Sequence, residues 1–152
     1  MKFVIQRVKS ASVEINSAIF SQINKGYLVL VGITDSDTEE IADKMIQKLI
    51  GLRIFEDENG KTNLSIKDVN GDMLIVSQFT LYADCKKGNR PSFIKAGNPA
   101  YAKELYQYIL KKTANLYEKT VYSGEFGADM KISLINDGPF TILLDSAEII
   151  TK

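Results

Sequence analysis

The run Gly26-Tyr27-Leu28-Val29-Leu30-Val31-Gly32-Ile33 is nearly continuous in apolar residues, and it decides the fold class that we predict. An apolar run of this length favours a strand that is buried on both faces. Upstream, residues 2–15 and 18–24 predict two more strands, joined at the short polar break Asn16-Ser17. Three predicted strands thus follow one another with no helix between them. Such an order disfavours a doubly wound parallel sheet, in which helices alternate regularly with strands.

Downstream of this run, the sequence predicts a helix. Ser36-Asp37-Thr38-Glu39 has the capping-box spacing that marks a helix start. Apolar residues then recur at helical spacing, at Ile41, Met45, Ile46, Leu49 and Leu52. Residues 53–56 predict a short strand that ends at the Asn59-Gly60 turn, and residues 73–76 predict a buried strand that leads to Ser77.

The second half of the chain predicts a loop, a helix and three strands. Residues 84–98 are polar and contain Gly88, Pro91 and Gly97, which is typical of a long loop. Asn98-Pro99 combines a good N-cap with proline at the first helical position, and the helix should reach about residue 116. Strands are expected near residues 119–123, 130–136 and 140–145.

These elements predict one domain over residues 1–152. We expect an α+β fold, in which a curved, largely antiparallel sheet forms a partial barrel and two helices pack on it. No apolar run approaches the length of about 18–20 residues that spans a bilayer. The first seven residues do not resemble a signal peptide, and the single cysteine, Cys85, fits a reducing compartment, so we expect a cytoplasmic protein.

The composition excludes several kinds of catalysis. The chain has no histidine, which removes Ser-His-Asp and Cys-His arrangements. With one cysteine and no histidine, a zinc site is disfavoured, and we expect neither a metal nor a cofactor. Nineteen basic and nineteen acidic residues cancel, so any contact with nucleic acid must be local. Hydrolysis would have to use carboxylates, a lone hydroxyl, backbone donors or groups of the substrate.

The first candidate site is Ser77-Gln78-Phe79-Thr80-Leu81, called the SQFTL segment below. It follows a predicted buried strand directly, and it places two hydroxyl groups and an amide within four residues. Backbone N–H groups at a strand end can also remain free to bind a carbonyl oxygen. The alternative is a polar strand end whose side chains satisfy nearby backbone groups.

The second candidate is Asn136-Asp137-Gly138-Pro139-Phe140-Thr141, called the Gly-Pro motif below. It joins two predicted strands, and Asn-Asp-Gly-Pro is strong turn chemistry, so composition alone favours a plain hairpin turn. The apolar neighbours of this turn, Ile135 and Phe140, indicate instead that it is pressed against another surface.

Charged residues near the two candidates carry further hypotheses. Arg7 interrupts an apolar strand, so it either faces outward or clamps backbone carbonyls with its fork of donors. Residues 84–98, called the basic loop below, carry Phe93 among several cations, which suits phosphate binding and base stacking as well as it suits a solvated loop. The cations are Lys86, Lys87, Arg90 and Lys95.

Three remaining side chains near the candidates carry weaker hypotheses. Cys85 adjoins the SQFTL segment, but without a histidine partner it is better interpreted as a bystander than as a nucleophile. Asp84 and Asp137 each lie near a candidate segment, and no spacing argument links them as a carboxylate pair.

Together the two segments resemble the D-aminoacyl-tRNA deacylase family. Residues 77–81 match its SQFTL motif, and residues 136–141 match its second motif, Asn-x-Gly-Pro-(Val/Phe)-Thr. The stretches Val4-Ile5-Gln6-Arg7-Val8 and Gly124-Glu125-Phe126-Gly127-Ala128-Asp129-Met130 are similar to the family as well. The resemblance covers essentially the whole chain, and the two motifs stand in order about 55 residues apart, which makes it specific.

The resemblance implies a homodimer with each site at the interface, where the Gly-Pro motif of one subunit enters the pocket of the other. By position, Gly138 and Pro139 would form a chiral filter with a cis peptide bond, and the catalytic pocket would be lined by Ser77, Gln78, Phe79 and Thr80. The filter would reject L-aminoacyl groups rather than recognise D side chains. Supporting residues by the same matching are Arg7, Asn136, Thr141, Phe126 and Met130, and Lys86, Lys87 and Arg90 are tentative tRNA contacts.

The implied reaction is proofreading in translation: hydrolysis of the ester of D-aminoacyl-tRNA, and of glycyl-tRNA mischarged on tRNA(Ala). The adjacent 2′-hydroxyl of the terminal adenosine would assist, while the protein supplies orientation and oxyanion stabilisation. A rival mechanism makes Thr80 a nucleophile, although it lacks an evident base. The alternative functions are a relative with a trans Gly-Pro bond that edits L-aminoacyl-tRNA, and a non-catalytic module that binds tRNA ends.

Overall fold

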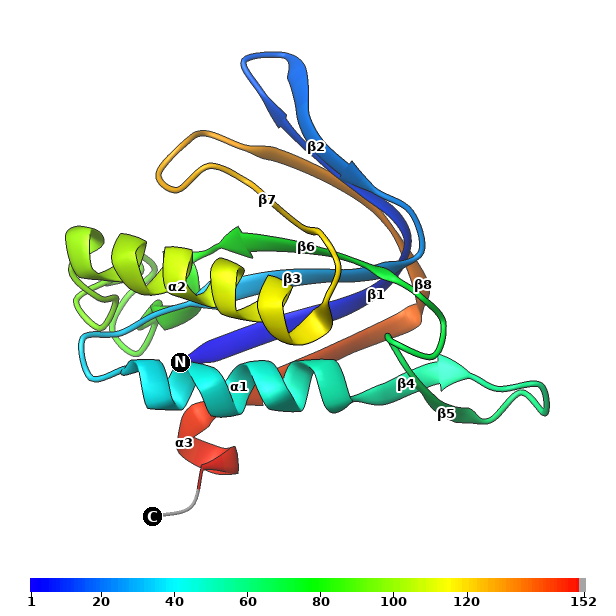
Figure 1. Ribbon diagram of the computed structural model, residues 1–152. Coiled ribbons are helices and arrows are strands. Elements are labelled where there is room, and N and C mark those ends of the chain that lie inside the picture. The colour runs from blue at the N-terminus through cyan, green and yellow to red at the C-terminus, as the bar shows by residue number, and fades with distance from the viewer. Residues whose placement is uncertain (151–152) are drawn as a thin grey trace.

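The computed structural model describes residues 1–150, which form a strongly curved sheet with helices along one side (Figure 1). The main sheet contains β1 (Lys2–Ile15), β2 (Ala18–Ile23), β3 (Gly26–Gly32), β6 (Asp72–Ser77), β7 (Val121–Ser123) and β8 (Lys131–Asp145). A second, small antiparallel sheet consists of β4 (Arg53–Glu56) and β5 (Thr62–Ser65). The helices are α1 (Glu39–Gly51), α2 (Pro99–Tyr117) and α3 (Ser146–Ile149), and a 3₁₀ turn, η1, spans Phe79–Tyr82.

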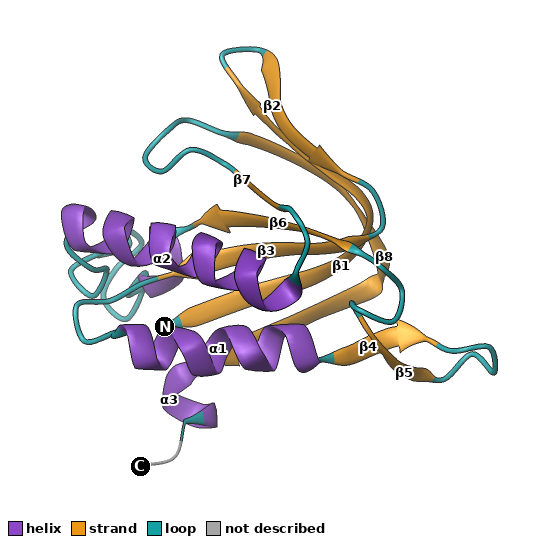
Figure 2. Ribbon diagram, viewed as in Figure 1, coloured by secondary structure: helices purple, strands orange, loops and turns teal. Residues whose placement is uncertain are grey.

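The long strand β1 organises the sheet. It pairs antiparallel with β3 and β2 in succession along one edge, and with β8 along the other. Beyond β3 the pairing becomes parallel, first with β6 and then with β7. The sheet is therefore mixed, and its curvature nearly closes it into a barrel (Figure 2). The predicted α+β class with a partial barrel is confirmed, and a third, short helix was not predicted.

The predicted burial of β3 on both faces is confirmed, and it explains how the core is divided. Tyr27, Val29 and Val31 face the main core, which also contains the apolar sides of α1 and α2. Leu28 faces a smaller cluster on the opposite side of the sheet, formed with Val8, Val13, Ile23, Leu74 and Val76. This alternation follows from the two-residue period of a strand.

The start of α1 differs from the prediction. Thr38 is the N-cap, and its hydroxyl accepts a hydrogen bond from the Ile41 N–H (3.3 Å), so the predicted capping box at Ser36 is wrong by two residues. The reason is a competing turn: the buried Asp37 carboxylate accepts from the Thr34 N–H (2.9 Å) and from the Met1 ammonium group (2.6 Å). Residues 34–37 therefore form a loop, and the helix begins after it.

The chain around the Gly-Pro motif also differs from the prediction. A single strand, β8, replaces the two strands expected on either side of a turn. Both of its halves pair with β1, because Asn136 lies opposite Val8 and Thr141 lies opposite Gln6. The four residues between them bulge out of the ladder opposite Arg7 alone. Turn residues thus create a bulge here instead of reversing the chain.

Two smaller elements escaped prediction because their sequences are short. The strand β5 completes a hairpin with β4 through the predicted turn at Asn59-Gly60. The 3₁₀ turn η1 follows β6 within the SQFTL segment. Among residues 1–150, no helix is long and apolar enough to cross a membrane.

Candidate active site

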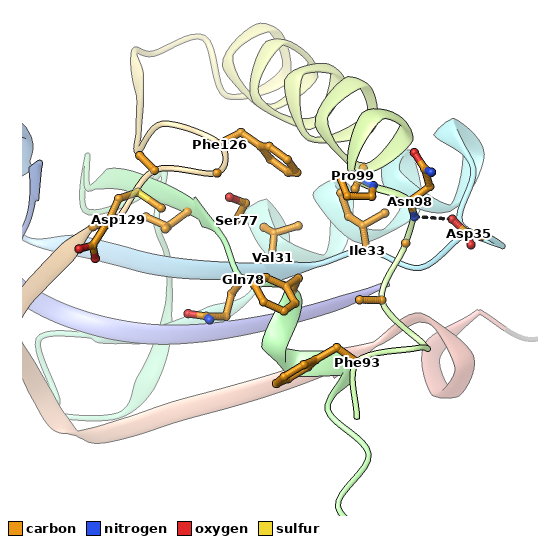
Figure 3. A pocket seen from close by; sticks show the side chains of 18 of the residues that line it. Val31, Ile33, Asp35, Ser77, Gln78, Phe93, Asn98, Pro99, Phe126 and Asp129 are labelled. Atoms are coloured by element: carbon orange, nitrogen blue, oxygen red, sulfur yellow. Dashed lines mark hydrogen bonds between the residues drawn. The ribbon is translucent and has the colours of Figure 1, made fainter. Parts of the chain in front are cut away.

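The main cavity of the molecule, about 820 Å³, lies where β3 and β6 end and α2 begins (Figure 3). Because β3 and β6 are parallel neighbours, their carboxyl ends meet at the same edge, with Val31 opposite Ser77. Strand ends of this kind are frequent places for binding sites, since the chain leaves the sheet there with free polar groups. The residues that line the cavity come from β3 and the loop after it, the end of β6, the SQFTL segment, residues 93–99, Ala102, the loop 126–130 and the start of β8.

The SQFTL segment forms the floor of this cavity. The Gln78 N–H donates to the Val31 carbonyl (2.7 Å), which is the last backbone link before the chain turns into η1. The N–H groups of Phe79 and Thr80 then open a helical turn, where the first donors have no internal acceptor, and the Gln78 side chain does not cap them. Figure 3 shows Ser77 and Gln78 directed into the cavity.

The position of Thr80 distinguishes it from the other members of the segment. Ser77, Gln78 and Phe79 line the cavity, whereas Thr80 does not. Its hydroxyl accepts a hydrogen bond from the Gln78 side-chain amide (2.5 Å). An amide donor cannot remove a proton, so this contact does not make Thr80 a stronger nucleophile.

One wall of the cavity, residues 95–98, is held by the loop that precedes α1. The Gly97 N–H donates to the Ile33 carbonyl (2.9 Å), and the Asn98 N–H donates to the Asp35 carboxylate (2.6 Å). Asp37 fixes the same loop from behind through its buried contact with the Met1 ammonium group. This wall was not predicted from the sequence, although the parallel pairing of two buried strands would have placed Asp35 close to Ser77.

The opposite wall carries Phe126 and Met130, two residues that the family resemblance had indicated. The Phe126 ring packs against Tyr106 with 5.9 Å between centroids. The Tyr106 hydroxyl donates to the Ile75 carbonyl (2.7 Å), and burial raises its pKa to about 12. Met130 packs directly on Gly124, so that a Cβ atom at Gly124 would lie 2.4 Å from the Met130 sulfur and would displace that side chain. Both wall residues are thus positioned by close packing.

The Gly-Pro motif is held by side chains at the opposite end of β3. The Arg7 guanidinium, 6% exposed, donates to the Asp137 carbonyl (2.8 Å) and to the Ile54 carbonyl (2.7 Å). It also lies over the Phe140 ring, with 4.4 Å from its central carbon to the centroid. Of the two roles considered for Arg7, the structure shows the clamp on backbone carbonyls.

Asn136 closes the bulge from within. Its side-chain oxygen accepts from the Phe140 N–H (2.7 Å), and its amide donates to the Phe140 carbonyl (3.0 Å) and the Thr141 hydroxyl (3.4 Å). The asparagine side chain thus replaces the strand partner that the bulged residues lack. Gly138 permits no side chain, because a Cβ atom would lie 2.1 Å from the Phe140 nitrogen. The Gly138–Pro139 peptide bond is cis.

Within one chain, the Gly-Pro motif and the SQFTL segment do not meet. The motif bulges beside Arg7, which pairs with Tyr27, while the SQFTL segment begins at Ser77, which pairs with Val31. Four residues of extended strand separate these positions along β3, or about 13 Å. Neither Gly138 nor Pro139 lines the cavity of its own chain. The residues around the motif, Arg7, Asn136 and Thr141, do not line it either.

Charge is divided sharply around the cavity. Among the described residues, its charged lining consists of two carboxylates, Asp35 and Asp129. The cations lie outside it, on the exposed tip of the basic loop, at Lys86, Lys87 and Arg90. Lys95 is different, because it pairs with Asp84 (2.9 Å), and its hydrogen bond lowers the pKa of that carboxyl.

Cys85 and the carboxylates form no further catalytic group in this structure. Cys85 is exposed and free. Asp137 pairs with Arg7 at 3.8 Å, and Asp84 pairs with Lys95, so the two carboxylates face different partners. Within residues 1–150, no group of three or more His, Cys, Asp or Glu side chains could hold a metal ion.

Comparisons with known proteins agree on one family. Residues 4–145 match the family described as D-Tyr-tRNA(Tyr) deacylase. A D-aminoacyl-tRNA deacylase of Thermosipho melanesiensis is 51% identical over 98% of this chain and 99% of its own length. One of Flavobacterium psychrophilum is 57% identical over 96% of this chain and 97% of its own.

Solved structures share the fold. The c-Myc DNA Unwinding Element Binding Protein superposes with a TM-score of 0.91 at 40% identity, over 95% of this chain and 98% of that one. A probable eukaryotic D-amino acid tRNA deacylase superposes with a TM-score of 0.84, over 94% of this chain and 97% of that one. At 17% identity, the second likeness concerns the fold alone.

Proposed function

Because the chain belongs to the D-Tyr-tRNA(Tyr) deacylase family, we propose that it is a hydrolase that cleaves the ester of D-aminoacyl-tRNA. The observation that carries the proposal is the cavity whose floor is the SQFTL segment. This cavity offers free backbone donors and apolar walls, and the chain has no histidine to activate water. An aminoacyl ester is already reactive, so orientation and oxyanion stabilisation suffice for its hydrolysis.

The second part of the proposal is a homodimer in which each pocket is completed by the Gly-Pro motif of the partner. It is supported by the separation of the two motifs within one chain. It is also supported by the surface of β8, whose second edge has no strand partner among residues 1–150 and whose apolar side chains Leu134, Ile135 and Leu143 are 36%, 57% and 59% exposed. An exposed apolar strand at a sheet edge is a natural site of association between copies.

The third part is the chiral filter. Arg7 and Asn136 hold the Gly-Pro motif in one shape, so its carbonyl oxygens can serve as fixed acceptors for the α-amino group of the substrate. A rigid motif at that position leaves no space for an L side chain, whereas a D side chain points elsewhere and glycine has none. Selectivity therefore arises from excluding the L form, and glycyl-tRNA should be cleaved as well.

For the reaction itself, we favour assistance by the 2′-hydroxyl of the terminal adenosine over attack by Thr80. Thr80 lies outside the cavity lining and receives a hydrogen bond from an amide, which is no base. The N–H group of Phe79, a residue that does line the cavity, is suited to stabilise the developing oxyanion. Full activity on tRNA that ends in 2′-deoxyadenosine would contradict this mechanism.

The RNA itself is proposed to contact the exposed tip of the basic loop, because its three cations belong to the same loop as Phe93, which lines the cavity. We also propose that the protein is cytoplasmic, because aminoacyl-tRNA is made in the cytoplasm.

The test is a deacylation assay with D-tyrosyl-tRNA, L-tyrosyl-tRNA and glycyl-tRNA, each at equal concentration. We expect rapid release of D-tyrosine and glycine, and a rate for L-tyrosine that is at least about 100-fold lower. Equal rates on the D and L esters would contradict the filter. Binding without hydrolysis of any ester would favour the non-catalytic alternative, and cleavage of the L ester alone would favour the L-editing one.

A further inference from the structure

We propose that Phe79 and Phe93, at the outer end of the cavity, form a stacking site for the penultimate nucleotide of the RNA, next to the terminal adenosine. This inference rests on the proposed function, because it assumes that the cavity receives the aminoacylated end of an RNA. It adds a second nucleotide to the recognised substrate and assigns a ligand to an aromatic surface that the hydrolytic reaction does not use.

The two rings form an edge-to-face pair, with 5.1 Å between centroids and 73° between planes. Such a pair covers only the edge of one ring and part of one face of the other. The remaining area is open to solvent, since Phe79 is 58% exposed and Phe93 is 39% exposed. Exposed aromatic faces beside a binding cavity are what unstacked bases require.

The position of this pair fits a nucleotide that leaves the cavity. In Figure 3, Ser77 and Gln78 lie between Phe126 on one side and Phe93 on the other. Phe126 is packed against Tyr106, which is fully buried in the main core, so this ring is held in place by the protein itself. An RNA end bound over Ser77 would therefore extend past Phe93.

Charge favours the same direction. The Asp35 carboxylate lines the cavity and disfavours a phosphate group inside it, whereas the Asp129 carboxylate is paired with Lys131 at 2.7 Å. Three exposed cations, Lys86, Lys87 and Arg90, belong to the same loop as Phe93. The phosphates that precede the terminal adenosine thus meet favourable charge on the side of the aromatic pair.

The aromatic pair is also ordered before any RNA binds. The backbone groups of Asp84 and Ser92 exchange two hydrogen bonds, at 2.7 and 2.9 Å. Lys95 adds an ion pair to Asp84 at 2.9 Å. These contacts close the base of the basic loop just before Phe93, so that little further ordering is needed on binding.

The experiment compares three esters of D-tyrosine: the full tRNA, the same tRNA with an abasic penultimate nucleotide, and 3′-(D-tyrosyl)adenosine. We expect Phe93→Ala to raise KM for the full tRNA about tenfold more than for the adenosine ester, as loss of one stacked base would. The abasic tRNA should show a similar increase with the unmodified protein. Combining the variant with the abasic tRNA should add little, because both changes remove the same contact.

Two variants guard this result. Phe93→Tyr keeps the ring and should retain the KM of the unmodified protein, and Phe20→Ala removes an aromatic side chain that is 52% exposed outside the cavity and should leave all three KM values unchanged. An equal KM increase on all three esters, or none on the full tRNA, would overturn the stacking site while the deacylase function stands. If the unmodified protein cleaves none of the esters, the proposed function fails, and the inference fails with it.

Discussion

The Gly-Pro motif and the SQFTL segment are positioned in opposite ways. Side chains fix the first: Arg7 and Asn136 occupy the carbonyl and N–H groups around the bulge. Backbone pairing fixes the second, and it stops at Gln78, so that the donors of Phe79 and Thr80 stay free. The difference indicates that the two regions have different roles: the Gly-Pro motif provides a rigid shape, and the SQFTL segment provides available hydrogen-bond donors.

The largest effect is expected from Arg7→Ala, which breaks the rigid region. The substitution leaves the carbonyls of Asp137 and Ile54 without their donor, so the free energy of unfolding should fall by about 3 kcal/mol. Hydrolysis of D-tyrosyl-tRNA should fall at least about 100-fold, because in the proposed dimer a displaced motif no longer fits the partner's pocket. Urea denaturation and kcat/KM measure the two effects.

Arg53→Ala is the matched control, since Arg53 is an exposed arginine bonded to Asn63. It should change the free energy of unfolding by no more than about 0.5 kcal/mol and leave kcat/KM intact. Equal losses of stability and of kcat/KM in Arg7→Ala and Arg53→Ala would contradict the role of Arg7 in holding the Gly-Pro motif.

A smaller loss is expected from Asn136→Ala, which removes the internal bracing of the bulge. The Phe140 N–H loses its acceptor, which should cost about 1–2 kcal/mol of stability and about 30-fold in kcat/KM. Asn136→Asp sharpens this test, because a carboxylate still accepts from that N–H but cannot donate to the Phe140 carbonyl. The activity of Asn136→Asp should lie between that of the unmodified protein and that of Asn136→Ala. An activity as low as that of Asn136→Ala would show that the hydrogen bond from the Phe140 N–H does not maintain the motif.

The comparison also shows where sequence reasoning succeeds. Burial of β3 on both faces and the capped start of α2 follow from local patterns, because hydrophobic periodicity and N-cap chemistry act over a few residues. The shape of the Gly-Pro motif does not, because it depends on Arg7, which lies 130 residues away from Asp137. Composition alone predicted a hairpin turn there, whereas pairing of both flanks with β1 produces a bulge.

The site residues also divide into those that follow from a local sequence pattern and those that depend on contacts between distant segments. Ser77, Gln78 and Phe79 could be found because they follow a strongly apolar strand. Asp35 and residues 95–98 could not, because a wall built from two loops depends on strand register and on tertiary hydrogen bonds. The roles of Phe126 and Met130 came only from the resemblance, since neither lies in a pattern with its own chemistry.

A modest effect is expected outside both regions, on the basic loop. Replacing Lys86 and Lys87 together by Glu should raise KM for D-tyrosyl-tRNA about tenfold with a smaller change in kcat, because the contact proposed for these cations is with phosphate rather than with the ester. The difference should shrink as salt concentration rises. Replacing Lys103 and Lys111 on the exposed side of α2 is the control, and an unchanged KM for the loop variant would remove the loop from the RNA-binding surface.

The smallest effect is expected from Thr80→Val, which tests whether the SQFTL segment acts through its backbone. The variant keeps the N–H group and the shape but loses the hydroxyl, so kcat should fall less than about threefold. A loss of about 1,000-fold or more, measured in single turnover, would indicate a nucleophilic Thr80 instead.

The central claim is that one subunit supplies the rigid motif and its partner supplies the donors, and mixed dimers test it most directly. Gly138→Ala distorts the motif, and Ala128→Trp fills the cavity, so each homodimer should be inactive on D-tyrosyl-tRNA. In a dimer of one chain of each kind, one site carries both defects and the other carries none. Co-refolding equal amounts should therefore restore about one quarter of the activity of the unmodified protein. A mixture no more active than the two variants alone would contradict the claim.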